Sequence, residues 1–530
     1  MQKHKHLYAS LLVALVSILP AQAQLVINEF MQSNVETIMD DISEFPDSWV
    51  ELYNPTDQTV NLADFSIGIK EEPSDAYKLP AKDIPAGGHI LIYCDKEEQG
   101  LHTDFRLESG KNGAIYLFKG DEIVDKLTKI AKMPAPDIAY GRKSDGDKKW
   151  GYELQPTPGT ANEGGLSDII LDEPIFSIPG GVYKDMSFSV ELSLPDGAPE
   201  GASIHYTTDG TEPTKDSPVY SEALNFSSSR VVRAKLFAEG AISRPSTTNS
   251  YLVLGRRVTL PVVSLTTNPK YLNDSKIGIY PNNDGDKKKV DWRRPVNFEY
   301  FPTPESEAAL NQLCETRVSG GATRGSKFKS QIVYANKRFG EKRLEYEFWP
   351  NSKPGMTDIK SIMLRNAGND FDYMYFRDAA IQMNMATHCD LDWQAYQPAI
   401  VFINGQYRGM LNIRERSNED NIYSNYNKLE DIDMFENWGE LKTGTWDNKM
   451  AFTEFYNKRG HTMAEYDQWM ECEEFLNLML MNIFYSNRDF PGNNIVMWRP
   501  TAEGGRWRWI AKDTDFGMGL YGHRYDYKTI

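Results

Sequence analysis

The chain has 530 residues and a mass of 60.4 kDa, a length that predicts roughly three to five folding units instead of one. Its 75 acidic residues outnumber its 58 basic ones, and the net charge of −17 excludes a general, phosphate-neutralising affinity for DNA or RNA. Hydrophobic residues make up 40% and charged residues 25%, which excludes wholesale disorder. We therefore expect a folded, multidomain protein with no nucleic-acid partner.

The first 24 residues have the pattern of a secretory signal peptide. Lys3 and Lys5 give a basic start, residues 7–19 form an apolar run, and residues 21–23 (Ala-Gln-Ala) are typical of a signal-peptidase site. A membrane anchor is the alternative, but the run is shorter than the ~20 residues that span a bilayer. We expect a signal peptide at residues 1–23 and a mature protein that is secreted, periplasmic or at the cell surface, with no transmembrane segment.

Residues 25–162 contain short apolar runs separated by turn clusters, the spacing that a β-sandwich requires. This segment resembles the lamin-tail domain, an immunoglobulin-like sandwich, through the strings LVINEFMQSN, SWVELYNPTDQTVNLADFSIG and YGRKSDGDKKWGYELQPTPGTAN. The resemblance implies a module for adhesion or positioning, without catalysis.

A second β-rich segment covers residues 174–254. Its Asp209-Gly210 pair lies between strand-like runs and predicts a hairpin turn, because glycine tolerates the positive φ that the turn needs. The segment resembles the C-terminal module of chitobiase and β-hexosaminidase, a small sandwich, through the strings YTTDGTEP and VVRAKLFAEGAISRP. The catalytic carboxylates of those enzymes lie in a different domain, so the resemblance implies a spacer, with glycan contact as the alternative.

Residues 256–530 change to a mixed α/β pattern. Helical periodicity is present at residues 375–387 and is strong at residues 464–486. The second stretch carries an aromatic and methionine stripe, which we expect to lie in a packed core. The polar residues that follow it are the first candidates for chemistry.

Four of these polar residues have the spacing of a magnesium-dependent phosphotransferase site. Asp489 and Asn494 are five residues apart, like the base and the metal-binding amide of the protein-kinase catalytic loop. Asp513 and Asp515 would share one face of a strand if the extended run before them continues, and such a pair is repulsive unless protonated or bridged by a cation. Magnesium prefers these oxygen ligands. The alternative is that the aspartates cap turns.

A basic segment covers residues 317–343. Eight basic residues and one acidic residue, Glu341, give it a local charge of +7, which favours phosphate binding. A turn at residues 320–325 offers the amide of Gly321 and the guanidinium of Arg324 to a phosphate, although its spacing is neither G-x-G-x-x-G nor Walker. The alternative is a solvated basic face on edge strands.

Together these elements resemble the CotH family of secreted or spore-coat atypical protein kinases. The matching strings are LPVVSL, RVSGGATRGSKFKSQIVYANKRFG, IMLRNAGNDFDYMYFRDAAIQ, PAIVFINGQYRGMLNIRER, NRDFPGNN and WIAKDTDFGMG. The resemblance implies a phosphotransferase that uses ATP, requires Mg²⁺ or Mn²⁺, and has a reduced kinase-like fold.

The resemblance also implies roles for single residues. Lys329 would hold the ATP phosphates and act in catalysis with Asp489, which would orient or deprotonate the acceptor hydroxyl. Asn494 and Asp513 would bind the metal, and Asp515 is a second metal candidate. The remaining ATP-binding candidates are Gly321, Arg324 and, to position the lysine or the metal, Glu415.

Two further pairs, Arg365-Asn366 and Arg377-Asp378, match the family, and we expect them to form structural salt bridges. The sequence stops thirteen residues after Gly517 (530 − 517), where a kinase-like lobe normally continues, so the last domain is expected to be short or truncated. The predicted fold is two all-β immunoglobulin-like sandwiches followed by an α+β atypical kinase-like domain. The predicted function is a secreted or cell-surface protein kinase with an unidentified protein substrate; the alternative is a non-catalytic pseudokinase that binds envelope or glycan material.

Overall fold

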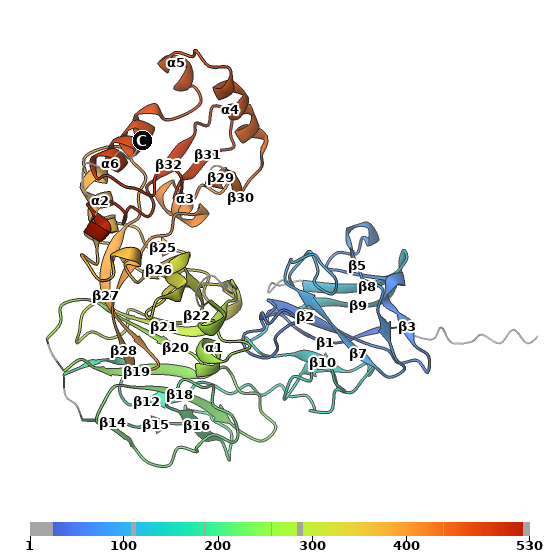
Figure 1. The fold of residues 1–530 in the computed structure, drawn as a ribbon. Helices are drawn as coiled ribbons and strands as arrows, with labels where there is room; N and C mark the ends of the chain where they lie inside the picture. Colours follow the sequence, from blue (N-terminus) through green and yellow to red (C-terminus); the bar gives the residue numbers. More distant parts are fainter. Residues whose placement is uncertain are drawn as a thin grey trace, which may run out of the picture.

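The computed structural model describes residues 25–107, 113–184, 187–255, 257–283, 290–437 and 439–522, and the predicted signal peptide lies outside these ranges. Figure 1 shows a central barrel with the N-terminal region beside it, a second β-rich region below it, and a C-terminal part above it that carries most of the helices. None of the described helices is long and apolar enough to cross a membrane.

The N-terminal region is built from two antiparallel sheets around one core, which fits the predicted sandwich. The first sheet has the order β11 (Trp150–Tyr152), β10 (Tyr140–Arg142), β1 (Val26–Met31), β2 (Ser48–Tyr53) and β7 (His89–Cys94). The second has the order β5 (Tyr77–Lys78), β4 (Phe65–Gly68), β8 (Gly113–Lys119) and β9 (Glu122–Ile130), and β3 (Val60–Asn61) pairs with β6 (Asp83–Ile84). Ile27, Leu52 and Ile92 of the first sheet share a core with Ile67 and Leu117 of the second.

The second region has one larger sheet with the order β13 (Gly181–Tyr183), β19 (Thr247–Val253), β18 (Arg230–Phe237) and β16 (Ser203–Thr207). Two short ladders join β14 (Phe188–Val190) to β17 (Leu224–Phe226) and β12 (Ile175–Phe176) to β15 (Leu192–Ser193). Asp209 and Gly210 form a turn in which Gly210 has a φ of 95°. After this turn the chain returns to β16 at residues 218–220, where His205 and Val219 form an antiparallel bridge, as a hairpin requires. The longer partner of β16 is β18.

A closed barrel begins the last region. Its strands have the order β20 (Val262–Thr266), β21 (Arg294–Phe301), β22 (Leu310–Ser319), β23 (Ser330–Tyr334), β26 (Ser361–Arg365), β28 (Gln406–Arg414) and β27 (Tyr396–Ile403). The barrel closes where β20 pairs in parallel with β27, for example Val263 with Val401. Phe298, Val333 and Leu364 lie in its core. Around it lie α1 (Pro269–Asn273), β24 (Leu344–Glu345) and β25 (Asp358–Ile359).

The C-terminal part has a sheet with the order β30 (Glu440–Thr443), β29 (Ile432–Glu436), β31 (Val496–Pro500) and β32 (Arg508–Ile510). Its helices are α2 (Arg377–Ala386), α3 (Glu419–Asn425), α4 (Asp447–Asn457), α5 (Met463–Tyr466) and α6 (Cys472–Phe484). α2 confirms the helix predicted at residues 375–387. The described structure is nevertheless mostly β with few helices, so the α+β kinase-like fold is not confirmed.

The long helix predicted at residues 464–486 is instead two helices, α5 and α6. The interruption has a backbone cause, because residues 469–471 bond to the strand region at Trp507. The Trp507 N–H donates to the Trp469 carbonyl (2.8 Å), and the Glu471 N–H donates to the Trp507 carbonyl (2.9 Å). These long-range backbone hydrogen bonds replace the helical hydrogen bonds that a continuous helix would need.

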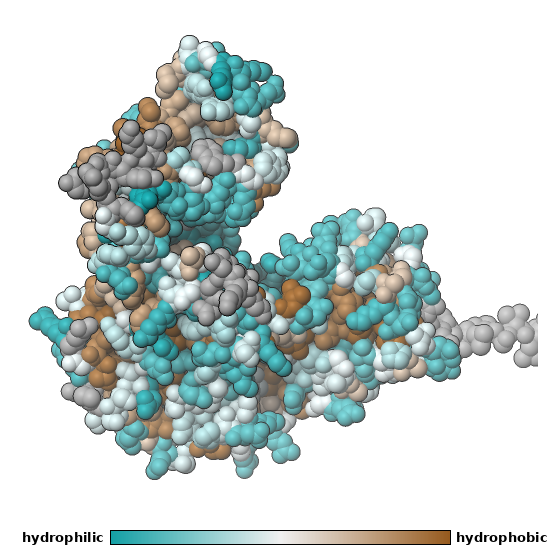
Figure 2. Space-filling model, in the orientation of Figure 1, coloured by the Kyte–Doolittle hydropathy of each residue, from teal (hydrophilic) through white to brown (hydrophobic). Residues whose placement is uncertain are grey.

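The expectation that the whole apolar stripe of this stretch is packed core is wrong for half of α6. The helix buries Leu478 and Met481 against the sheet. Phe475 and Met479 are partly buried against the same core. Four further apolar side chains are exposed: Leu476, Leu480, Ile483 and Phe484. Figure 2 shows hydrophobic atoms at the surface over this part of the molecule. Periodicity alone did not reveal which side of the stripe meets the protein.

Candidate functional site

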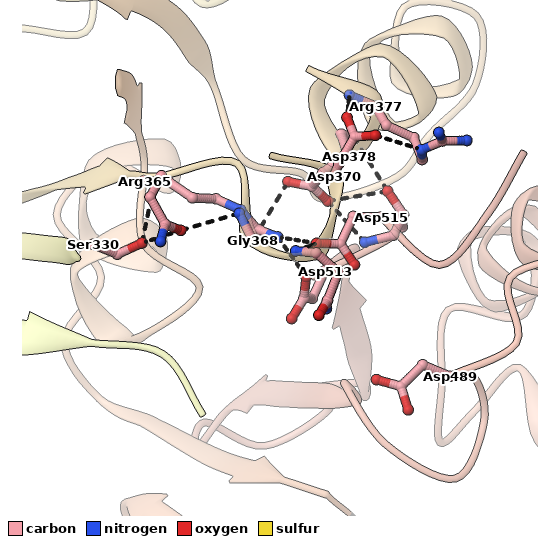
Figure 3. Close-up of polar contacts among 12 residues, drawn as sticks. Ser330, Arg365, Gly368, Asp370, Arg377, Asp378, Asp489, Asp513 and Asp515 are labelled. Atoms are coloured by element: carbon pink, nitrogen blue, oxygen red, sulfur yellow. Dashed lines mark hydrogen bonds and ion pairs between the residues drawn. The ribbon is translucent and has the colours of Figure 1, made fainter. Parts of the chain in front are cut away.

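Asp513 and Asp515 lie together around the guanidinium of Arg365, the last residue of β26 (Figure 3). Arg365 donates from Nη2 to Asp513 Oδ1 (2.6 Å) and to Asp515 Oδ2 (2.8 Å). The structure therefore brings the two predicted metal candidates together, but not by the expected route. β32 ends at Ile510, and Asp513 has a left-handed φ of 50°, so a tight turn and not an extended strand places the two carboxylates side by side.

Two residues at the start of α2 hold the loop that carries these aspartates. Asp378 Oδ1 accepts the backbone N–H of Thr514 (2.7 Å) and its hydroxyl (3.0 Å). Arg377 donates from Nη1 to the carbonyls of Gly517 (3.1 Å) and Met518 (2.7 Å). The loop is thus pinned on both sides of Asp515, which fixes where that carboxylate points.

The same residues confirm the expected salt bridges. Arg377 donates from Nε to Asp370 Oδ1 (2.9 Å). Asp378 Oδ2 lies 3.0 Å from Arg414 Nη2 and 3.8 Å from Arg365 Nη1. These ions are buried, and a buried ion that loses its partner costs several kcal/mol. The pairs are therefore structural, and what they support is the Asp513–Asp515 loop.

Gly368 allows the turn after β26 to approach this loop closely. Its φ is 62°, and a Cβ added there would lie 2.5 Å from Asp515 Oδ2. The backbone N–H of the next residue, Asn369, donates to the same oxygen (3.1 Å). A side chain at position 368 would push this amide away from the carboxylate.

The environment of Asp515 disfavours its ionised form. Its side chain is fully buried, and within the described residues its Oδ1 has no hydrogen-bond partner. Burial, followed by the charge of Asp513, raises the pKa of Asp515 to about 7, although Arg365 opposes the shift. For Asp378, burial also favours protonation, but Arg414 and Arg365 outweigh it and hold the pKa below its usual range. Arg365 therefore neutralises the negative charge of Asp513 and Asp515 only in part, while Arg414 pairs with Asp378.

Asp489 and Asn494 face each other on the loop after α6. Asn494 Nδ2 donates to Asp489 Oδ2 (2.7 Å), and the neighbouring Asn493 donates to the same oxygen (3.2 Å). Burial and the charge of Asp513 raise the pKa of Asp489, against these hydrogen bonds. Asp489 therefore lies within electrostatic reach of Asp513, and Figure 3 shows its carboxylate across a gap from the Arg365 cluster.

The donor set fits a magnesium ion in chemistry. The carboxylates of Asp513 and Asp515 and the amide oxygen of Asn494 are hard ligands, and Asp515 Oδ1 is a buried acceptor without a protein donor. In the described part of the chain, however, the two carboxylates do not belong to a group of three or more His, Cys, Asp or Glu residues whose ligand atoms all lie within 4.8 Å of one another. The guanidinium of Arg365 donates to both aspartates and occupies the space between their carboxylates.

The group that does meet this distance is Asp40, Asp95 and His102 in the N-terminal region. His102 Nδ1 is 2.7 Å from Asp95 Oδ2, and its Nε2 is 3.4 Å from Asp41 Oδ1. Ordinary hydrogen bonds therefore explain the position of this ring, and nothing further points to a metal there.

Lys329 lies beside the Arg365 turn through a backbone link. Its Nζ donates to the carbonyl of Arg324. The next residue, Ser330, donates its hydroxyl to Asn366 Oδ1 (2.8 Å), and Asn366 Nδ2 donates to the Phe328 carbonyl (2.6 Å). Because Asn366 directly follows Arg365, the strand start that carries Lys329 is fastened to the residue that holds the two aspartates.

Arg324, Gly321 and Glu415 stand apart from this cluster in their contacts. Arg324 donates to Asn283 Oδ1 (2.6 Å) and Asp291 Oδ1 (2.9 Å), so it anchors its own turn, while Gly321 borders open space. Glu415 is buried and pairs with Lys353 (2.6 Å). Their assignment to ATP stays a prediction, and for Arg324 and Glu415 the structure gives a structural role.

The basic segment does not form one phosphate-binding surface. Arg317 pairs with Asp291, and Arg343 pairs with Asp358 (2.7 Å). Arg338 pairs with Glu315. It also donates from Nη1 to three carbonyls of the N-terminal region: Asn34 (3.0 Å), Phe45 (2.9 Å) and Pro46 (3.2 Å). Charges that are adjacent in sequence are thus divided among several acidic partners.

A cleft of about 770 Å³ lies beside Arg338, between the N-terminal region and the barrel. Basic side chains such as Arg317 and Lys342 line its barrel side, and acidic ones such as Asp40 and Glu97 line the other. Figure 2 shows hydrophilic surface on both sides of this hollow. The cleft is therefore bipolar, unlike the uniformly basic face that the sequence predicted.

Sequence reasoning missed the importance of Arg365, Gly368 and Asp378 for this site. The Arg365-Asn366 and Arg377-Asp378 pairs were noticed, but nothing in their spacing shows that they reach residues about 140 positions later. The available signal was the position of these charges: Arg365 ends an apolar strand, and Arg377 and Asp378 begin a helix.

Comparison with known families supports the domain order. Residues 19–131 match the Lamin Tail Domain, residues 178–248 the Chitobiase/beta-hexosaminidase C-terminal domain, and residues 320–530 the CotH kinase protein family. No curated protein matches the chain. The folded units extend beyond two of these matches, because β10 and β11 follow residue 131 and the barrel begins at β20, before residue 320. The chain therefore carries, in order, a lamin tail domain, a chitobiase/β-hexosaminidase C-terminal domain and a domain of the CotH kinase family.

Proposed function

We propose that this chain is an atypical protein kinase that transfers the γ-phosphate of ATP to protein hydroxyls. The observation that carries the proposal is the pair of the partly exposed Asp513 and the buried Asp515, fixed by Arg365 and Asp378, with Asp489 within electrostatic reach. Phosphoryl transfer asks a protein mainly to position two oxygens in line and to neutralise charge. A pinned carboxylate pair beside a single loop aspartate meets that requirement.

Asp489 is the proton acceptor in this proposal. Its pKa is raised by burial and by Asp513, which makes it a stronger base than an exposed aspartate. The amide of Asn494 donates to one carboxylate oxygen and so orients the other. An acceptor hydroxyl placed against the other oxygen would lose its proton to Asp489 as its oxygen bonds to the γ-phosphorus of ATP. The bond from that phosphorus to the β-phosphate oxygen would break in the same step, with ADP as the leaving group.

Asp513, Asp515 and Asn494 would hold one or two magnesium or manganese ions, which neutralise the phosphate oxygens of ATP when bound. Lys329 would add a cation on the barrel side, where Ser330 and Asn366 fasten its strand to the Arg365 turn. Arg365 would be displaced from between the aspartates as the oxygens of Asp513 and Asp515 turn to their new partner.

The test is transfer of label from γ-labelled ATP, with Mg²⁺ or Mn²⁺, to the protein itself and to an envelope protein extract. Asp489→Asn and Asp513→Asn should each lower incorporation by roughly 10²-fold or more. Asp447→Asn is the matched control, because Asp447 is exposed at the start of α4. Equal incorporation in the wild type and both site variants refutes the proposal and leaves a non-catalytic binding protein.

Export and positioning complete the proposal. The signal-peptide pattern of residues 1–23 supports export across the cytoplasmic membrane, and the two β-rich modules would hold the protein on envelope or glycan material. Mass spectrometry of the secreted protein should find an N-terminus at Gln24. Retention of the full chain on envelope polysaccharide, lost when that polysaccharide is added free in solution, tests the second part.

A further inference from the structure

A cavity of about 340 Å³ lies between the second β-rich region and the barrel, and none of the site residues described above lines it. Its walls come from the turn at Thr208 and Asp209, the start of β18 at Arg230, and the hairpin between β27 and β28. Small-molecule sites usually have volumes of ~300–1,000 Å³, so this cavity suits one compact ligand.

The walls are held together by close backbone contacts. Asn404, in the hairpin, accepts the Thr267 N–H (2.9 Å) and donates to the Thr267 carbonyl (2.8 Å). A Cβ on Gly405 would lie 3.2 Å from the Cα of Arg230, and a Cβ on Gly210 would lie 2.5 Å from the Thr267 carbonyl oxygen. The two regions are therefore in close backbone contact, and the cavity between them is preformed.

Two arginines line this cavity, and within the described part of the chain neither forms an ion pair. Arg408 donates from Nη2 to Gln406 (3.0 Å), but its Nε is buried and has no hydrogen-bond partner there. Arg230 donates from Nη1 only to the Ser229 carbonyl (3.0 Å). Buried donors in folded proteins are almost always satisfied, so Arg408 points to a missing acceptor.

The one acidic residue that lines the cavity does not supply that acceptor. Asp209 Oδ1 accepts the backbone N–H (2.9 Å) and the hydroxyl (2.6 Å) of Thr211 two residues on, in the turn itself. The lining therefore keeps a net positive charge, with two guanidinium groups and one carboxylate that is already hydrogen-bonded.

We propose that this cavity binds the oxyanion of a small organic molecule, a carboxylate, sulfate or phosphate, between Arg230 and Arg408. A guanidinium matches such groups because its N–H donors are arranged as a rigid fork. Pro269, Leu272 and Ile403 line the same cavity and give an apolar wall for the carbon skeleton. The site would make the junction of the second module and the barrel a ligand-dependent contact.

The test is isothermal titration calorimetry on the full chain with four probes: glucuronate, glucose, inorganic sulfate and inorganic phosphate. Glucuronate should bind, glucose should not, and added salt should weaken binding. Arg408→Gln and Arg230→Gln should each weaken glucuronate binding by about tenfold or more, as expected for a lost charge-assisted hydrogen bond. Lys215→Gln, an exposed charge of the same module outside the cavity, should leave binding unchanged.

The outcomes separate clearly. Binding of sulfate or phosphate as tight as that of glucuronate supports the oxyanion site and assigns the apolar wall no role. Absence of binding for all three anions, or equal binding in both arginine variants and the wild type, overturns the proposal. Arg230 is exposed, so its variant keeps the test decisive if Arg408→Gln does not fold, which near-UV circular dichroism would reveal. The result does not depend on kinase activity.

Discussion

Glu153, in the N-terminal region, is a buried carboxyl group whose replacement by Gln is expected to stabilise that region at alkaline pH. Its side chain is 2% exposed, and among the described residues neither of its oxygens has a hydrogen-bond partner. Burial, and then the charges of Glu29, Glu51 and Asp145, raise its pKa to about 9 from a usual 4.5. The folded protein therefore keeps this group protonated at neutral pH, whereas the unfolded chain ionises it.

The sign and size of the effect follow from this difference in pKa. Because the pKa is raised on folding, the stabilising contribution is fully present below pH 4.5 and is lost as the pH rises towards about 9. At roughly 1.4 kcal/mol for each pH unit, the loss between pH 5 and pH 8 is about 4 kcal/mol for a group that titrates alone. Burial also raises the pKa of Glu51 to about 8 and that of Glu29 to about 7, so the three carboxyl groups titrate together. We therefore expect the replacement of Glu153 alone to raise the unfolding free energy at pH 8 by roughly 2 kcal/mol.

The assay is native-state hydrogen exchange by mass spectrometry on the full chain at pH 5 and pH 8, corrected for intrinsic exchange rates. The peptides that cover β10 and β11 report the opening free energy of this sheet. Glu153→Gln should match the wild type at pH 5 and exceed it at pH 8. Glu122→Gln, in which an exposed carboxyl is changed, is the control. A variant that is less stable than the wild type at pH 8, or a pH slope that does not change, refutes the reasoning.

Three further outcomes are expected. Arg365→Gln should lower the free energy of urea unfolding of the C-terminal part by about 3 kcal/mol, since it leaves the buried Asp515 and the partly exposed Asp513 without their counter-ion; no change would contradict the ion-pair account. Gly368→Ala should weaken Mn²⁺ binding, measured by electron paramagnetic resonance, because its Cβ would displace Asp515, and unchanged affinity would show that the close approach is irrelevant. Arg338→Gln should speed proteolysis of residues 34–46, and equal cleavage rates would mean that other contacts fasten the N-terminal region.

Local patterns predicted the β-rich N-terminal half because each strand there is bounded by its own turn signal, as at Trp49 or Ile90. The barrel could not be predicted in the same way. Its closure depends on the parallel pairing of β20 with β27, which joins residues more than 130 positions apart. Nothing in a local pattern encodes such a pairing, and the expected α+β kinase-like fold is not confirmed.

The site was predicted in part, and for a reason that differs from the observed one. Asp513 and Asp515 were expected together on a strand, yet the left-handed turn at Asp513 and the guanidinium of Arg365 bring them together. Asp489 and Asn494, which were paired by their spacing in the sequence, form a direct hydrogen bond in the structure. Partners that are distant in sequence, such as Asp378 for Thr514, become visible only when the chain is folded.

The fastening of the N-terminal region by Arg338 fixes how that region stands on the barrel. Three carbonyl groups from two separate loop segments converge on a single guanidinium, so the region cannot swing freely about the barrel. A ligand held by residues 25–162 would therefore lie at a fixed distance from Asp489. If the chain is the kinase that we propose, this distance would help to decide which hydroxyl is modified.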